Sequence, residues 1–254
     1  GFPQRRKRVY ILAYAPGTEA HVELCGRTNQ IDWIETSGVL ASAFPIKKLG
    51  GTDGISIFDL RSDSKQDLAD ISQCFMPGKR GLSPFLEAGV MIGGKVWTTK
   101  VKSHYDGPVT SLRDVLLEPK NIEDEFVIKP SDMMKERGWL YLKGAKSEPR
   151  LGTDGFTYQY KEGPITFPDA LDRPSRTIVT GEGGTTPSRF KHVVEFMPTK
   201  EQVERLNLRS DEAMDAREKL GFGVTKWLRR LTPIELERLN GFPDNHTEGV
   251  THGY

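Results

Sequence analysis

The sequence has few of the features that mark secreted, metal-binding and membrane proteins. Its 254 residues include two cysteines, Cys25 and Cys74, which argues against a disulfide framework and predicts a reducing, cytoplasmic location. Neither cysteine has a Cys-x-x-Cys partner and the five histidines are scattered, so no zinc site is expected. No apolar run approaches the roughly 20 residues that span a bilayer, and the first residues lack the apolar core of an export signal.

An excess of charge of one sign is also missing. The net charge of +1 argues against binding to polyanions over the whole surface. Cations nevertheless cluster in "QRRKR" (4–8), "SRFKH" (188–192) and "WLRR" (227–230), which leaves a local basic face open. No Ser/His/Asp or Cys/His arrangement, paired acidic motif or Gly-rich cofactor loop stands out. The chain is therefore equipped to bind rather than to perform chemistry unaided.

The local patterns predict an α+β, loop-rich fold with small antiparallel sheets and short helices. We expect a core strand at Val9–Tyr14, a β-type run in "RTIVT" (176–180), and a hairpin in "VMIGGKVWTTKV". Brief helices are expected at 111–119 and 130–138, and one long charged helix at 199–221 that ends at Gly221. Residues 139–170 are expected to be loop-rich.

The sharpest local signal is "LTPIELERLNGFPDNH" (231–246). Thr232 suits the N-cap and Pro233 the first helical position, and Glu235 completes a capping box. Gly241 is placed to end the helix in a left-handed conformation. The segment predicts a short, firmly bounded helix with a structural role.

The basic cluster before the expected strand is the first candidate site. On a strand, Arg6 and Arg8 would point to one face, and Arg5 and Lys7 to the other. Two guanidinium groups on one face could hold a phosphate or a base carbonyl with planar, bidentate donors. A solvated charge run is the alternative.

The second candidate is "RPSRTIVTGEGGTTPSRFKH" (173–192), in which Gly181, Gly183 and Gly184 follow the β-type run. Glycines allow close approach of a ligand to the backbone, and exposed N–H groups bind anions. The segment lacks Gly-Lys-Ser/Thr and a following helix, so neither a P-loop nor a dinucleotide loop fits. A loop along a DNA backbone and a simple hairpin loop remain open.

The order of these segments resembles DNA (cytosine-5)-methyltransferases. "FPQRRKRVYILAY" resembles their eighth sequence block, "RRLTPIELERLNGFPD" resembles their ninth, and "TIVTGEGG" resembles the "TxTxxGG" element of the target-recognition domain between those blocks. The family's Phe-x-Gly-x-Gly loop, Pro-Cys nucleophile loop, Glu-Asn-Val acid and tenth block are absent from the sequence. The resemblance therefore implies the C-terminal, recognition part of such an enzyme, in a longer protein, a split enzyme or a shortened gene product.

The resemblance also implies partners and site residues. Double-stranded DNA would be the substrate, S-adenosylmethionine would bind the missing catalytic half in cis or on another subunit, and no membrane would be involved. A bacterial restriction–modification system is the expected context. The target-cytosine pocket would use Gln4, Arg6 and Arg8, with Arg8 reaching the base. DNA would be contacted by two sets of residues: Arg176, Thr177, Thr180, Gly183 and Gly184 at the groove, and Ser188, Arg189 and Lys191 at phosphates.

The resemblance divides the chain into a segment 1–15 of the catalytic domain, a recognition domain 16–228 and a joining helix and turn 229–254. "GWLYLKGAK" (138–146) is a candidate second recognition loop. Two other functions remain open: a stand-alone DNA-binding module, and a nucleotide-binding enzyme that uses "GEGGTT". A Pro-Cys loop in the parent reading frame or a neighbouring gene would favour the methyltransferase.

Overall fold

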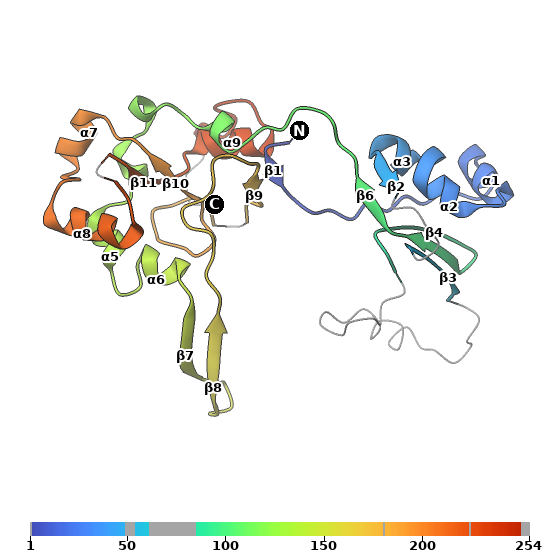
Figure 1. Cartoon of the computed structure of the whole chain (residues 1–254), viewed down its shortest axis with the longest axis horizontal. Coiled ribbons are helices and arrows are strands. Elements are labelled where there is room, and N and C mark those ends of the chain that lie inside the picture. Colours follow the sequence, from blue (N-terminus) through green and yellow to red (C-terminus); the bar gives the residue numbers. More distant parts are fainter. Residues whose placement is uncertain (1, 49–53, 61–84, 180, 224, 250–254) are drawn as a thin grey trace. The chain divides into compact units, whose positions relative to one another are not determined.

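The computed structural model describes residues 2–48, 54–60, 85–179, 181–223 and 225–249. Thr180 and Cys74, which the sequence singled out, lie outside these residues. The chain forms two compact units, one of Gly1–Arg8 with Pro108–Tyr254 and one of Val9–Gly107 (Figure 1). The recognition region predicted at 16–228 thus draws on both units. Within the described residues, no helix is both long and apolar enough to cross a membrane.

The Val9–Gly107 unit combines short helices with small antiparallel sheets. The helical segments are α1 (Glu19–Gly26), α2 (Gln30–Asp32), the π-helical turn η1 (Trp33–Ser37) and α3 (Val39–Ala43). The strands are β2 (Ile46–Lys48), β3 (Ile55–Asp59), β4 (Ala88–Ile92), β5 (Lys95–Thr99) and β6 (Val101–Ser103), ordered β3-β5-β4 in one sheet and β2-β6 in another. The predicted hairpin is confirmed: Ile92 pairs with Lys95, and Gly93 and Gly94 take positive φ angles of 58° and 93° between them.

The strand predicted at Val9–Tyr14 is wrong. The backbone there pairs with no other described strand, and Val9 and Ile11 are both 86% exposed. The ring of Tyr10 instead packs on Phe44, and that of Tyr14 on Trp33. An apolar β-type run becomes a strand only when a neighbouring strand takes up its backbone hydrogen bonds, and the described residues offer none.

The other unit holds the main hydrophobic core. Its α-helices are α5 (Pro130–Met134), α6 (Trp139–Lys143), α7 (Lys200–Arg205), α8 (Asp211–Leu220) and α9 (Pro233–Asn240), and its single-turn 3-10 helices are η3 (Arg113–Val115), η4 (Pro119–Asn121) and η5 (Asp124–Phe126). Its strands are β1 (Gln4–Arg5), β7 (Lys146–Leu151), β8 (Thr157–Glu162), β9 (Ser175–Arg176), β10 (Val193–Phe196) and β11 (Trp227–Arg230). The antiparallel β10–β11 pair runs through the centre, where Trp227, Leu228 and Val193 are fully buried.

The predicted start of one helix and the predicted ends of two are confirmed in this unit. Thr232 and Glu235 form the predicted capping box, and Gly241 ends α9 with a φ of 78°. Gly221 ends α8 in the same way, with a φ of 67°. The brief helix expected at 130–138 is α5, whereas the one expected at 111–119 is only the turn η3.

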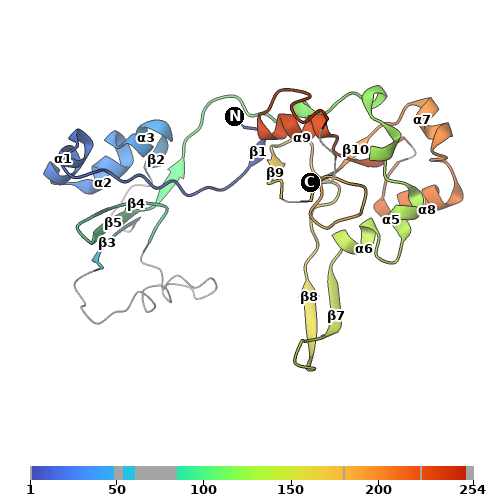
Figure 2. The ribbon, with the colours of Figure 1, turned by 180° about the vertical axis from the view of Figure 1, so that it is seen from behind.

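The predicted secondary structure of three other segments in this unit is wrong. The helix predicted at 199–221 is divided into α7 and α8, because Asn207 takes a φ of 51° and Ser210 starts a new helix as its N-cap. The β-type run 176–180 contributes only Arg176 to the strand β9. Residues 139–170 contain the antiparallel hairpin β7–β8, which extends away from the rest of its unit (Figures 1 and 2). Together these elements give the predicted α+β class, with small sheets and short helices.

Candidate functional site

The N-terminal basic cluster lies beside the strand that enters the glycine loop, which we define as residues 181–187. Strands β1 and β9 pair in parallel, with Gln4 opposite Ser175 and Arg5 opposite Arg176. The Thr177 hydroxyl extends this contact by donating to the Arg5 carbonyl at 2.9 Å. Segments about 170 residues apart in the chain are therefore joined by backbone pairing, which places the two candidate sites side by side.

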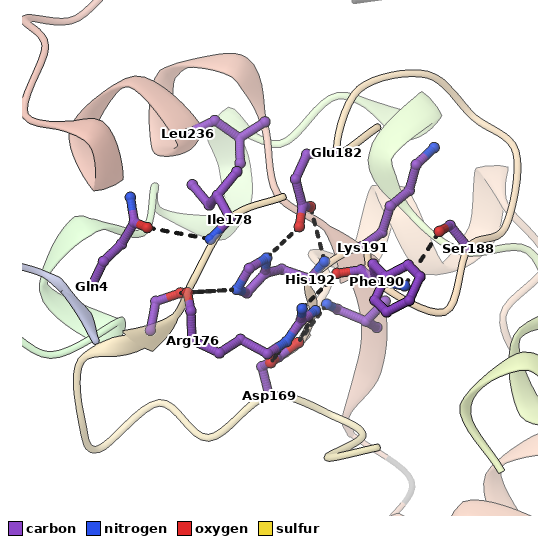
Figure 3. Close-up of polar contacts among 12 residues, drawn as sticks. Gln4, Asp169, Arg176, Ile178, Glu182, Ser188, Phe190, Lys191, His192 and Leu236 are labelled. Carbon is purple, nitrogen blue, oxygen red and sulfur yellow. Dashed lines mark hydrogen bonds and ion pairs between the residues drawn. The ribbon is translucent and has the colours of Figure 1, made fainter. Parts of the chain in front are cut away.

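Gln4 is a buried junction between three segments. Its Nε2 donates to the Leu239 carbonyl at 2.8 Å and to Asn240 Oδ1 at 3.1 Å, both at the end of α9. Its Oε1 accepts from the Ile178 N–H at 3.2 Å (Figure 3). The amide thus connects the N-terminal segment and the end of α9 to the segment before the glycine loop. A role for Gln4 at the target cytosine stays a prediction.

The four cations Arg5 to Arg8 are exposed. Arg8 Nη1 donates to the Lys7 carbonyl at 3.1 Å, and none of the four forms an ion pair with another described residue. Since the strand ends at Arg5, no sheet sets the predicted alternation of Arg6 and Arg8. The cluster is therefore a solvent-facing set of donors that follows directly on the strand β1.

A fully buried histidine, His192, holds the glycine loop, and the sequence indicated it only as the last residue of the basic cluster 188–192. His192 Nδ1 lies 2.6 Å from Glu182 Oε1, and the His192 N–H donates to Glu182 Oε2 at 2.9 Å (Figure 3). On the other side of the ring, His192 Nε2 lies 2.9 Å from the Ser175 hydroxyl. The order serine, histidine, carboxylate resembles a nucleophilic triad. Ser175 is only 2% exposed, however, so no substrate reaches it and the network is structural.

The arginines of the second candidate site are held by internal partners. Arg176 pairs with Asp169 at 2.7 Å and donates to the Phe190 carbonyl at 2.5 Å. Arg189 pairs with Glu162 at 3.1 Å, and its guanidinium also donates to carbonyls of Leu142 and Gly163. These bonds tie the segment after the glycine loop to the base of the β7–β8 hairpin. Contacts of these arginines with DNA stay predictions.

The remaining predicted contacts lie on or near the loop surface. Gly183, Gly184, Thr177 and Ser188 are half-buried, and the Ser188 hydroxyl accepts from the Phe190 N–H at 3.2 Å. Gly184 has a φ of 72°, a conformation that favours glycine. Lys191, by contrast, is buried beneath the loop.

Lys143 at the end of α6 is a buried lysine that sequence reasoning placed only in a possible recognition loop. Its Nζ donates to the Arg189 carbonyl at 2.8 Å and to the Lys191 carbonyl. Burial, followed by the nearby Arg176 guanidinium, lowers the pKa of Lys143 from 10.5 to about 8. The candidate loop 138–146 therefore supports the segment after the glycine loop through this side chain.

The lowered pKa of Lys143 predicts a pH-dependent stability. Between about 8 and 10.5, the unfolded chain holds this proton while the folded chain has released it, so the free energy of unfolding should rise with pH. Below pH 8 both states are protonated and this contribution is flat. Denaturant unfolding at several pH values should show the rise in the native chain but not in Lys143→Met. Parallel profiles for the two chains would contradict the assignment.

The described residues offer no metal site and no evident nucleophile. No group of three or more His, Cys, Asp or Glu side chains in the described ranges could hold a metal ion. Cys25 is exposed on α1, with its Sγ 3.5 Å from His21 Nε2 on the next helical turn. It lies in the unit without the glycine loop.

Comparisons with known proteins give a matching family and a similar relative. The family model for C-5 cytosine-specific DNA methylases matches residues 1–252. The type II methyltransferase M.Sau3AI of Staphylococcus aureus is 29% identical over 251 residues, which are 98% of this chain and 49% of that relative. The chain thus spans about half the length of this curated relative. No solved structure matches the chain.

Proposed function

Because the chain belongs to the C-5 cytosine-specific DNA methylase family, we propose that it is the target-recognition part of a DNA (cytosine-5)-methyltransferase. In this role it binds duplex DNA around one specific sequence and holds the cytosine to be methylated. The complete protein would act in a bacterial restriction–modification system, as the name of the M.Sau3AI relative suggests for that protein.

The observation that carries this proposal is the junction between the segments that resemble the two family blocks and the strand before the glycine loop. The side chain of Gln4 bonds to both Ile178 and Leu239, and β1 pairs with β9. The start of the basic cluster, the strand before the glycine loop and the end of α9 are thereby joined. Such a site combines exposed guanidinium donors for phosphate or base with a loop that a DNA backbone can approach closely.

Arg6 and Arg8 are the proposed groups for the extruded cytosine. Methylation at C5 requires the base to leave the duplex, which costs a few kcal/mol of stacking and pairing. Exposed guanidinium groups offset this cost by donating to the base carbonyl and to the flanking phosphates. Gly183, Gly184, Thr177 and Ser188 would contact the DNA beside the base.

In this proposal, the nucleophile and the cofactor site belong to the catalytic half of the enzyme rather than to these residues. The sequence contains no Pro-Cys pair and no Phe-x-Gly-x-Gly loop, so its residues do not fit S-adenosylmethionine. That cofactor supplies the methyl group in the proposed reaction, and the catalytic half that binds it would be in the same protein or on another subunit. The present residues bind the duplex, read it and hold the base.

The natural full-length protein should methylate plasmid DNA at C5 of cytosine within one short sequence. Bisulfite sequencing of plasmid from expressing cells reads both the chemistry and the target. The 254-residue chain alone should bind that sequence in a fluorescence anisotropy assay without methylating it. Specific binding without methylation by the full-length protein would instead favour a stand-alone DNA-binding module.

A further inference from the structure

Two buried cations converge on the inner side of the glycine loop. Lys191 Nζ donates to the carbonyls of Gly184 at 3.0 Å and Thr186 at 2.8 Å. Arg230, the last residue of β11, donates through Nη1 to the same Gly184 carbonyl at 2.6 Å and through Nη2 to the Glu125 carbonyl. Arg230 belongs to β11, and Lys191 lies just before β10. The two central strands of the unit therefore hold the loop through these side chains.

These cations are hidden from solvent. Lys191 and Arg230 are each 5% exposed. Burial lowers the pKa of both side chains, and the Arg230 charge lowers the pKa of Lys191 further. A buried cation is tolerated only where its donors are satisfied. Because the carbonyls of Gly184 and Thr186 supply the acceptors of Lys191, a movement of the loop would leave the Lys191 charge without them and Arg230 with the Glu125 carbonyl.

Glu182 holds the start of the same loop. Its two carboxylate oxygens contact the ring and the backbone N–H of His192, so residues 182, 184 and 186 are all tied inward. Among the described residues, the backbone N–H groups of residues 182–186 donate to no other group. The carbonyls of Gly184 and Thr186 are thus occupied inside, while these amides have no partner among the described residues and can bind an anion such as a DNA phosphate.

We propose that Lys191 and Arg230 are positioning residues that shape the glycine loop for sequence-specific DNA contact, and that Lys191 does not itself contact a phosphate. This inference rests on the proposed function, since it assigns the loop to DNA. A positioning role and a direct phosphate contact differ in the salt dependence of DNA binding. A lysine that contacts a phosphate contributes about 0.9 to the slope of log K against log salt, whereas a buried lysine contributes to loop shape.

The test compares Lys191→Met with Lys219→Met in the natural full-length protein. Lys219 is an exposed lysine on α8, paired with Asp215 at 3.1 Å, and serves as the matched control. The first readout needs no DNA: a glutamate-specific protease should cleave after Glu182 at least about tenfold faster in Lys191→Met, because the loop opens locally. The control should be cleaved at the native rate.

The second readout is DNA binding at several salt concentrations. Lys191→Met should lose about tenfold in the affinity ratio of target to unrelated DNA, with the salt slope unchanged. A slope smaller by about 0.9 with an unchanged ratio would overturn the inference in favour of a phosphate contact. Unchanged protease cleavage would overturn it as well.

The results distinguish a failure of the proposed function from a failure of the positioning role of Lys191. If the native protein has no preference for any DNA sequence, the proposed function fails, and protease cleavage alone decides whether Lys191 holds the loop. If Lys191→Met does not fold, Arg230→Lys replaces it. That variant keeps the buried cation but cannot reach the Gly184 and Glu125 carbonyls together, so faster cleavage and a lower affinity ratio are expected again.

Discussion

Replacing Arg8 with alanine in the full-length protein should slow methyl transfer by about 10- to 100-fold while weakening DNA binding only a few-fold. The Arg8 guanidinium is exposed, donates only to the Lys7 carbonyl and forms no ion pair with another described residue, so its other donors are available to a base. A charge-assisted hydrogen bond is worth roughly 1.5–3 kcal/mol, which corresponds to this loss of rate if the bond forms only to the extruded cytosine. Single-turnover methylation and anisotropy measure the two quantities.

Lys7→Ala is the matched control for this prediction. Lys7 is the exposed neighbour of Arg8, and its compact charge lacks the planar fork that suits a base carbonyl. Its loss should weaken binding to all DNA sequences and leave the single-turnover rate at saturating DNA unchanged. Equal turnover of Arg8→Ala and the native protein would refute the assignment of Arg8 to the cytosine.

Replacing Glu235 with alanine should destabilise the unit that contains α9 by about 3–5 kcal/mol. Glu235 is fully buried and pairs with Arg229 through both oxygens at 2.6 and 2.7 Å. The same carboxylate accepts from the N–H groups of Thr232 and Leu117, both at 2.8 Å. Its loss removes the capping box and leaves the Arg229 guanidinium buried without its anion.

Thermal unfolding of the chain measures this effect. A loss of about 3 kcal/mol corresponds to a midpoint lower by roughly 6–12 °C for a chain of this size. Asp215→Ala, which removes the exposed partner of Lys219, is the control and should change the midpoint little. A Glu235→Ala midpoint close to that of the control would mean that the ion pair does not stabilise the unit.

Features that depend on residues close together in the chain were predicted correctly, whereas features that depend on distant residues were not. Thr232, Glu235 and Gly241 were predictable, since each acts within a few residues through a cap or a left-handed turn. The long helix at 199–221 was not, because charged residues favour helix on both sides of Asn207 and nothing local required the break there.

The candidate site illustrates the same separation. Sequence patterns identified the basic cluster and the glycine loop, and the family resemblance ordered them. They did not reveal that Arg176 forms an ion pair with Asp169, or that Lys191 donates to loop carbonyls. A cation in a sequence is compatible both with a phosphate contact and with a buried structural role. The cluster "SRFKH" included His192, but it did not indicate that the ring would be buried between Ser175 and Glu182.

The sequence by itself determined the boundaries of α9, the Gly93–Gly94 hairpin, the α+β class and the family, since these follow from residues close together in the chain and from ordered blocks. Only the tertiary structure decided which cations face solvent and which are buried. A side chain is buried where distant segments supply its acceptors, as Gly184 does for Arg230 from 46 residues away. The same reason left Val9–Tyr14 without a strand, since no described segment takes up its backbone hydrogen bonds.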